Sequence, residues 1–125
     1  MYEIDRDTIR FANGKRQRFS SPIAESLDFD ASIVIRLESG PKYTAINVFA
    51  FDYYGKLLWH IPAPRSYDPQ NPYVGIFRKG GFVEILNWDG HLLTLHAEKG
   101  MILKEGFFAE GRPSSRRTPS VRRWL

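Results

Sequence analysis

Residues 82–103 show the clearest alternation of apolar and polar positions in the chain, in three short runs separated by two turn signals. The first signal, Asp89-Gly90, fits a two-residue hairpin loop, because both central residues of such a loop need a positive φ. The second is Glu98-Lys99-Gly100, with glycine at a position where turns favour positive φ. The pattern predicts three antiparallel strands joined by tight turns, and the other expected elements are arranged around this meander.

A two-residue loop at Asp89-Gly90 fixes how the first two of these strands pair. Leu86 then lies opposite Leu93, and Glu84 lies opposite Leu95. Because side chains alternate along a strand, one face of the meander collects the large apolar residues and is expected to be buried. That face carries Phe82, Leu86, Trp88, Leu93 and Leu95.

Further strands are predicted before and after this meander. Residues 8–19 form a second hairpin around Asn13-Gly14, a strong short-range turn signal, with Ile9 expected opposite Arg18 and Phe11 opposite Arg16. Residues 43–52 are apolar on both faces, which indicates a central strand covered on both sides, and residues 56–61 return after a turn at Asp52–Gly55. Residues 32–37, residues 73–78, which turn into the meander at Gly80-Gly81, and a last strand at Phe107 and Phe108 complete the set. The expected core includes Phe49, Phe51, Leu58, Ile85, Leu86, Leu93 and Leu95.

These elements place the chain in the all-β class, as an antiparallel meander of about 8–9 strands in two packed sheets or a partly open barrel. Residues 20–30 are the one candidate for a helical turn, and an extended linker fits them as well. Residues 62–72 hold four of the eight prolines. Because proline lacks a backbone donor, this segment cannot be an interior strand, and it is either a functional loop or a crossover between sheets.

The net charge of +4 is concentrated at one end of the chain. Residues 110–125 carry five arginines and one glutamate, whereas residues 1–109 are neutral overall. The composition predicts a single β domain at 1–109 and a flexible basic tail at 110–125. A cytoplasmic location is expected, since the chain shows neither an apolar signal core nor an apolar run of ~20 residues.

Two segments resemble the repeat of β-propellers of the pyrroloquinoline-quinone type. Residues 47–61, NVFAFDYYGKLLWHI, follow that repeat's order of strand, Asp, Gly, two apolar residues and Trp. Residues 87–103, NWDGHLLTLHAEKGMIL, fit the same template but depart at Ala97, where the repeat has Asp, and at Lys104, where it has Trp. The same segments give the chain a likeness to small uncharacterised bacterial β proteins. The resemblance implies meander units. It implies no cofactor, because a closed propeller needs at least about four blades and this chain is too short for one.

Residues suited to catalysis or metal binding are few. The chain has no cysteine, which excludes disulfides and thiolate sites, and His60, His91 and His96 lack the spacing of metal ligands. His91 with Asp89 is either a base with an orienting acid or a half-exposed hairpin residue. Glu84 is a candidate acid or base if it is buried, and otherwise an edge carboxylate that reaches water. We therefore expect neither a cofactor nor a metal.

Candidate contact residues lie in loops, in one hairpin arm and in the tail. Tyrosines without an expected core role are typical of contact surfaces, and the basic arm from Lys15 to Arg18 either prevents sheet pairing or meets an acidic partner. The candidate partner contacts are Arg16, Arg18, Tyr53, Tyr54, Arg65, Tyr67, Arg116, Arg117, Arg122, Arg123 and Trp124.

The leading functional hypothesis is a non-enzymatic protein-binding module. Self-association into a homodimer comes first, because open sheets leave edges that pair, and an inhibitory or immunity-type role is another version. The alternative is a weak nucleic-acid binder that uses the tail and the arm from Lys15 to Arg18, since about five arginines neutralise at most about five phosphates. A small enzyme with an unrecognised site is the third hypothesis.

Overall fold

The computed structural model describes residues 1–38, 46–61 and 72–107, and every regular element among them is a β-strand. Eleven strands form three antiparallel sheets. The all-β class and the antiparallel meander are confirmed. The expected strand number was too low, and the sheets number three instead of two.

Each sheet is built from strands that follow one another in sequence, which is the meander unit that the propeller resemblance implied. The N-terminal sheet has the order β1 (Glu3–Asp5), β2 (Thr8–Arg10), β3 (Arg16–Arg18). The central sheet has the order β4 (Ile23–Asp28), β5 (Ile33–Leu37), β6 (Val48–Phe51), β7 (Leu57–His60). The C-terminal sheet has the order β8 (Tyr73–Lys79), β9 (Phe82–Asn87), β10 (His91–His96), β11 (Ile102–Phe107).

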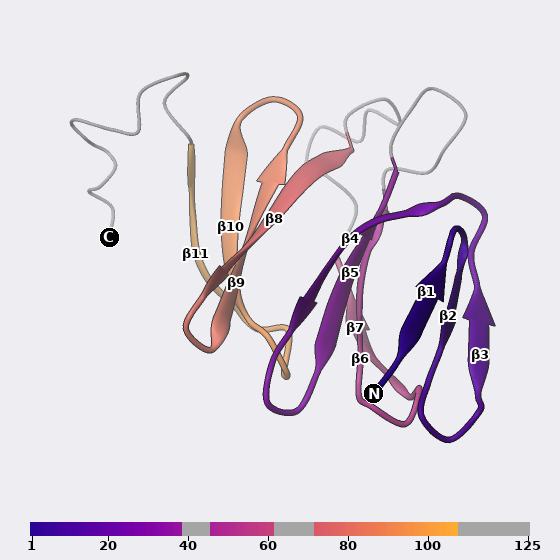
Figure 1. Ribbon diagram of the computed structural model, residues 1–125. Coiled ribbons are helices and arrows are strands. Elements are labelled where there is room, and N and C mark those ends of the chain that lie inside the picture. The colour runs from indigo at the N-terminus through magenta and orange to yellow at the C-terminus, as the bar shows by residue number, and fades with distance from the viewer. Residues whose placement is uncertain (39–45, 62–71, 108–125) are drawn as a thin grey trace.

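The three sheets are stacked face to face, with the central sheet between the other two (Figure 1). One core lies between the central and C-terminal sheets and contains Val34, Val48, Ala50, Val83, Ile85, Leu93 and Leu95. A second core lies between the central and N-terminal sheets and contains Ile9, Phe11, Ile33, Ile35, Leu37 and Phe51. Apolar burial on both faces of the central sheet therefore holds the stack together.

β6 behaves as its sequence predicted. Val48 and Ala50 belong to one core, whereas Phe51 belongs to the other and Phe49 packs beside it. Of the expected core residues, Phe51, Ile85, Leu93 and Leu95 are buried. Phe49, Leu58 and Leu86 are only partly buried.

Two hairpins have loops one residue longer than predicted. Gly90 N–H donates to the Asn87 carbonyl at 3.0 Å, so Trp88 belongs to the loop, and Leu86 pairs with Leu92 instead of Leu93. The hairpin at Asn13-Gly14 closes in the same way, since Gly14 N–H donates to the Phe11 carbonyl. Both turns occur at the predicted positions, but in each hairpin the observed strand pairing differs by one residue from the predicted pairing.

A shift of one residue exchanges the two faces of a strand. In β9 the buried side chains are Val83, Ile85 and Asn87. The predicted buried face of Phe82, Leu86 and Trp88 was therefore wrong. Phe82 and Leu86 lie on the outer face, and Trp88 stands in the loop with 70% of its surface exposed.

Two strands were missing from the sequence prediction. β4 occupies most of the segment expected to form a helical turn or a linker. Pairing with β5 overrides its weak strand propensity, and Arg36 of β5 anchors it with an Nε contact of 2.5 Å to Glu25 Oε2. β1 turns into β2 through Arg6, which has a φ of 59°. Because Arg6 is not a glycine, this turn carries no recognisable turn residue in the sequence.

Specific contacts join neighbouring sheets at two places. The buried Asn47 amide donates to the carbonyl oxygens of Leu37 at 3.0 Å and Tyr73 at 2.8 Å, and it accepts from Tyr73 N–H at 3.2 Å. Trp59 of β7 lies against Gly100 in the β10–β11 turn, and its indole N–H donates to the Ala97 carbonyl at 2.9 Å. These contacts fix how the C-terminal sheet sits on the central one.

Candidate functional site

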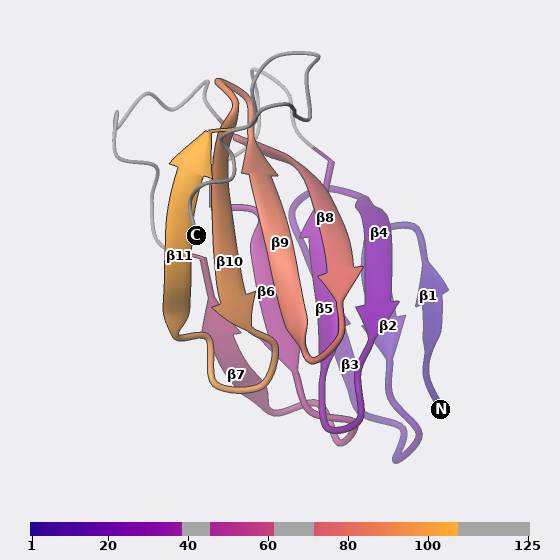
Figure 2. The same cartoon turned by 90° about the vertical axis from the view of Figure 1, so that its left-hand side faces the viewer.

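The two ends of the stack present outer faces of different chemistry. The outer face of the C-terminal sheet, turned toward the viewer in Figure 2, has no other sheet over it among the described residues. By register and alternation it carries Phe77, Lys79, Phe82, Glu84, Leu86, Leu92, Thr94, His96 and Lys104. The outer face of the N-terminal sheet carries Glu3, Asp5, Thr8, Arg10, Arg16 and Arg18.

Two aromatic side chains are exposed on the outer face of the C-terminal sheet. Phe77 is 49% exposed and Phe82 is 38% exposed, although both are large apolar residues. Leu86 and Leu92 are paired across β9 and β10 on the same face, where Leu86 is half-buried and Leu92 is buried. Exposed aromatic residues that lie close together on a folded chain are typical of an interaction site.

Glycines lie at both ends of the row that contains Leu86 and Leu92. Gly75 pairs with Leu86, and Gly106 pairs with Leu92, so neither end of the row has a side-chain wall. The Phe77 ring leans over Gly75, since a Cβ built there would lie 3.1 Å from Phe77 Cζ. The Phe77 ring therefore occupies the space that a side chain at Gly75 would fill.

One ion pair lies within this face, beside Phe77 and Phe82. Lys79 Nζ lies 3.5 Å from Glu84 Oε2, and Glu84 pairs with Thr94 of β10. The prediction that Glu84 lies opposite Leu95 was wrong because of the shifted register. With Lys79 beside it, Glu84 is a surface carboxylate in an ion pair.

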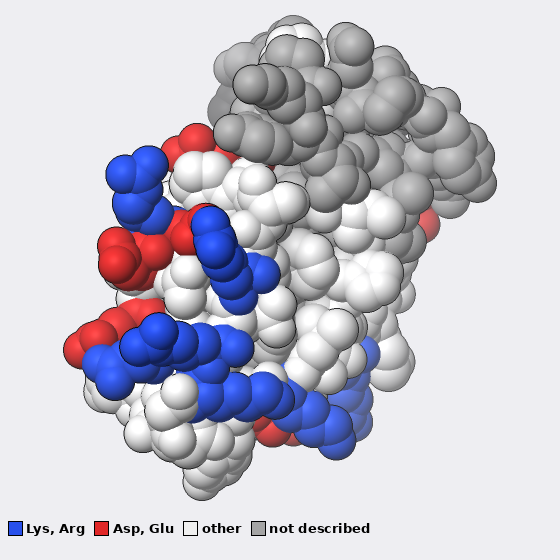
Figure 3. Space-filling view, turned by 90° about the vertical axis from the view of Figure 1, so that its right-hand side faces the viewer, with Lys and Arg blue, Asp and Glu red and all other residues white. Residues whose placement is uncertain are grey.

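The outer face of the N-terminal sheet is charged throughout. Arg10 Nη2 lies 2.6 Å from Glu3 Oε1, and Arg18 Nε lies 3.2 Å from Asp7 Oδ2. Figure 3 shows Lys and Arg side chains among Asp and Glu side chains on this side of the molecule. The basic arm from Lys15 to Arg18 is thus partly neutralised by carboxylates, which weakens its attraction for a polyanion.

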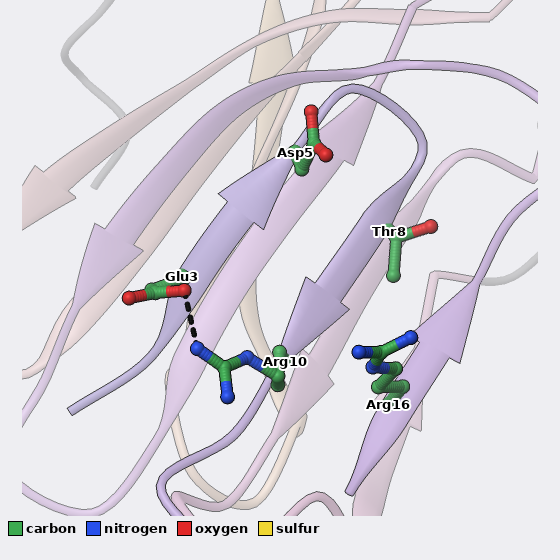
Figure 4. A pocket seen from close by; sticks show the side chains of 5 residues that line it. All are labelled: Glu3, Asp5, Thr8, Arg10 and Arg16. Carbon is green, nitrogen blue, oxygen red and sulfur yellow. Dashed lines mark hydrogen bonds and ion pairs between the residues drawn. The ribbon is translucent and has the colours of Figure 1, made fainter. Parts of the chain in front are cut away.

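A shallow hollow of about 380 Å³ lies on this charged face, lined by Glu3, Asp5, Thr8, Arg10 and Arg16 (Figure 4). Hydrogen bonding to Arg10 lowers the pKa of Glu3 and raises the pKa of Arg10. Hydrogen bonds from Thr8 and Arg18 lower the pKa of Asp7. These shifts come from exposed ion pairs, which contribute little to stability, and they keep the face charged.

A second hollow, of about 340 Å³, lies where the β4–β5, β8–β9 and β10–β11 turns meet. Arg78 forms one wall, with its guanidinium 4.7 Å from the centre of the Phe29 ring and a hydrogen bond to the Asp28 carbonyl. His96 forms another, and its Nδ1 accepts the N–H groups of Glu98 and Lys99. Arg78 and His96 are both engaged in shaping the turns.

Among the predicted contact residues, Tyr53 and Tyr54 are placed differently. The Tyr53 hydroxyl donates to the Phe29 carbonyl at 2.6 Å, and its ring packs against the N-terminal core. Tyr54 is 71% exposed, and its carbonyl accepts from Asn13 Nδ2 at 3.1 Å, which joins two turns of neighbouring sheets. Arg16 and Arg18 are exposed on β3.

The other predicted contacts fall outside the described residues. They are Arg65, Tyr67, Arg116, Arg117, Arg122, Arg123 and Trp124. The proline-rich segment at 62–72, except for Pro72, and the predicted tail at 110–125 also lie there.

The histidines are dispersed within the part of the chain that the structure describes. His91 Nε2 lies 3.3 Å from Glu105 Oε1, so its carboxylate partner is Glu105, and Asp89 instead accepts the His91 backbone N–H. No group of three or more His, Asp or Glu residues that could hold a metal occurs among the described residues. Across 1–38, 46–61 and 72–107, no helix has the length and apolarity needed to cross a membrane.

Sequence reasoning missed Phe82 as a surface residue because it assigned Phe82 to the buried face of the meander. A three-residue loop at Trp88-Asp89-Gly90 pairs Leu86 with Leu92, and it leaves Phe82, Glu84 and Leu86 on the face opposite to Leu93 and Leu95. The charge of Glu84 was therefore the available signal that this face of β9 meets solvent.

No curated protein matches this chain. One family profile does match, and it spans residues 1–107, which include all three sheets. The chain therefore belongs to the family described as a domain of unknown function (DUF7957).

Proposed function

We propose that this chain is a protein-binding module and that the outer face of the C-terminal sheet is its binding surface. The observation that carries the proposal is the distribution of exposed apolar side chains. Among the described residues, Phe77 and Phe82 are exposed on this face, and Trp88, Met101, Ile102 and Leu103 are exposed in the turns and the edge strand of the same sheet. Exposed apolar residues are ordinary when scattered and informative when they gather.

The composition of this surface supports a protein partner. Phe77 and Phe82 provide exposed aromatic side chains, and the Lys79–Glu84 pair lies beside them on the same face. Aromatic residues are enriched in protein interfaces. A nucleic acid would instead require cations in excess, and the described basic arm is interspersed with Glu3 and Asp7.

The proposal is tested by comparing single variants of the tagged full-length chain in capture experiments from its native cells. Phe77→Glu places a carboxylate in the apolar surface, and we expect captured partners to decrease at least about tenfold. Tyr54→Glu is the matched control, because Tyr54 is an exposed aromatic residue on another part of the molecule. If the unmodified chain, Phe77→Glu and Tyr54→Glu all captured the same amount of partner, this surface would not be the binding site.

A further inference from the structure

We propose that the hollow where the β4–β5, β8–β9 and β10–β11 turns meet binds a small zwitterion, a molecule that carries one carboxylate and one ammonium group. In this site Arg78 holds the carboxylate, and Asp30 and Glu98 hold the ammonium group. The proposal goes beyond the protein-binding surface, because the hollow lies at one end of the sheets, where the three turns gather (Figure 1).

Hydrogen bonds between the turns fix the walls of this hollow. Ser32 Oγ donates to the Ala97 carbonyl at 3.1 Å, and Ala97 N–H donates to the Gly81 carbonyl at 3.2 Å, so all three turns are tied together. Gly80 and Gly81 add no side chains, and a Cβ built at either would meet nothing within 4 Å. The volume of about 340 Å³ lies at the lower end of the range for small-molecule sites. The hollow is therefore formed before a ligand arrives, and its size suits a small molecule.

Arg78 is fixed in place and has no carboxylate partner among the described residues. Its guanidinium lies 4.7 Å from the centre of the Phe29 ring and donates to the Asp28 carbonyl. A guanidinium has about five N–H donors, so one bond to a carbonyl leaves most of them available. Because these contacts already hold the side chain, binding an anion costs it little further conformational entropy. A guanidinium in this state is suited to bind a carboxylate through two parallel hydrogen bonds.

Two carboxylates share the hollow with Arg78. Asp30 belongs to the β4–β5 turn and Glu98 to the β10–β11 turn, and both are exposed. Neither carboxylate lies within ion-pair distance of Arg78 or of any other cation in the described part of the chain. The three charges therefore do not neutralise one another, and a ligand that carries both signs of charge is their complement.

This pattern of charges disfavours other classes of ligand. A phosphate group or a nucleic acid would bring several negative charges toward one arginine and two carboxylates. A simple cation would be repelled by Arg78, whereas a zwitterion pairs with all three charged groups. Since these groups meet water, which screens their attraction, we expect an affinity in the millimolar range.

Titration with a series of ω-amino acids tests the site. Glycine, β-alanine, γ-aminobutyrate and ε-aminocaproate carry the same two charges at increasing separation. Added to the isotope-labelled full-length chain, at least one of them should shift the amide resonances of Ala31, Gly80 and Ala97 and leave that of Thr8, in the other hollow, unchanged. Acetylation of the amino group of that ligand removes its positive charge and should weaken binding at least about tenfold. The inference is wrong if no member of the series shifts these amides or if the acetylated form binds equally well.

Substitutions in the hollow assign the charges to their roles. Arg78→Gln should weaken binding of the ligand chosen from the series at least about tenfold, and the double variant Asp30→Asn, Glu98→Gln should do the same. The two carboxylates are exposed in turns, so the double variant remains informative even if Arg78→Gln disturbs the fold, which circular dichroism checks. Arg16→Gln is the matched control, because Arg16 is an exposed arginine that lines the other hollow. An unchanged affinity in the double variant, or an equal loss in Arg16→Gln, would overturn the inference.

Discussion

Gly100 has no side chain at a point where the C-terminal sheet touches the central one. Its φ is +71°, and a Cβ built there would lie 2.5 Å from Trp59 Cγ. Gly14 has a similar φ of +89° but nothing within 4 Å of its Cβ position. Comparing alanine substitutions at the two glycines therefore separates two contributions to the loss of stability. One is the cost of a left-handed backbone at a residue with a side chain, and the other is the cost of disturbing a contact between sheets.

We predict that Gly14→Ala lowers the free energy of unfolding by about 1–2 kcal/mol, the cost of a left-handed alanine. Gly100→Ala should lower it by a further 1–3 kcal/mol or so, because the new methyl group displaces Trp59 and overpacks the junction. Urea unfolding followed by tryptophan fluorescence measures both. Equal losses in the two variants would show that Trp59 moves aside at no cost.

At the scale of elements, the sequence predicted turns better than registers. Gly80-Gly81 and the Asp52–Gly55 turn were correct, since in each case the turn residues alone define the loop. The dipeptide Asp89-Gly90 fits a two-residue loop and also the end of a three-residue loop. The three-residue loop is the one that forms, because it lets Val83 and Ile85 pack in the core. β4 was missed because its strand state comes from pairing with β5, which the local sequence does not encode.

The loop assignment predicts that Trp88 can be deleted. Without it, Asp89-Gly90 becomes a two-residue loop that closes on Asn87 and His91, and Leu86 still pairs with Leu92. Because Trp88 is mostly exposed, we expect a loss of under about 1 kcal/mol and an unchanged circular dichroism spectrum.

Deletion of Thr94 is the contrasting variant. It lies inside β10, so its removal sends Leu93 and Leu95, both now in the core, to opposite faces. That protein should not fold. If deletion of Trp88 were equally damaging, the loop residue would have a structural role that its exposure does not suggest.

At the scale of the whole molecule, the sequence predicted the class and one central strand but neither the stack of three sheets nor the exposed aromatic residues at its C-terminal end. Apolar residues on both faces of β6 implied layers on both sides, and the structure has them. The candidate surface could not be predicted, because it depends on which face of β9 points outward, and a single loop residue decides that. Residue patterns within one strand therefore determine burial only after the pairing is known.

The stack also predicts an order of local stability. β5 and β6 are buried on both faces, whereas the N-terminal sheet consists of three strands of three residues each and is anchored mainly by Ile9 and Phe11. In native-state hydrogen exchange, the amides of β5 and β6 should exchange only through global unfolding, and those of the N-terminal sheet through local opening at a lower free energy.

Ile9→Ala and Leu95→Ala test this order from opposite sides of the central sheet. Each removes a buried side chain from one of the two cores, at a cost of about 2–5 kcal/mol. Ile9→Ala should increase exchange in β2 and β3 far more than in β9 and β10, because the lost contacts hold only the N-terminal sheet. Leu95→Ala should have the opposite distribution. If both variants increased exchange equally in all three sheets, the molecule would unfold as one cooperative unit, and the N-terminal sheet would have no separate opening.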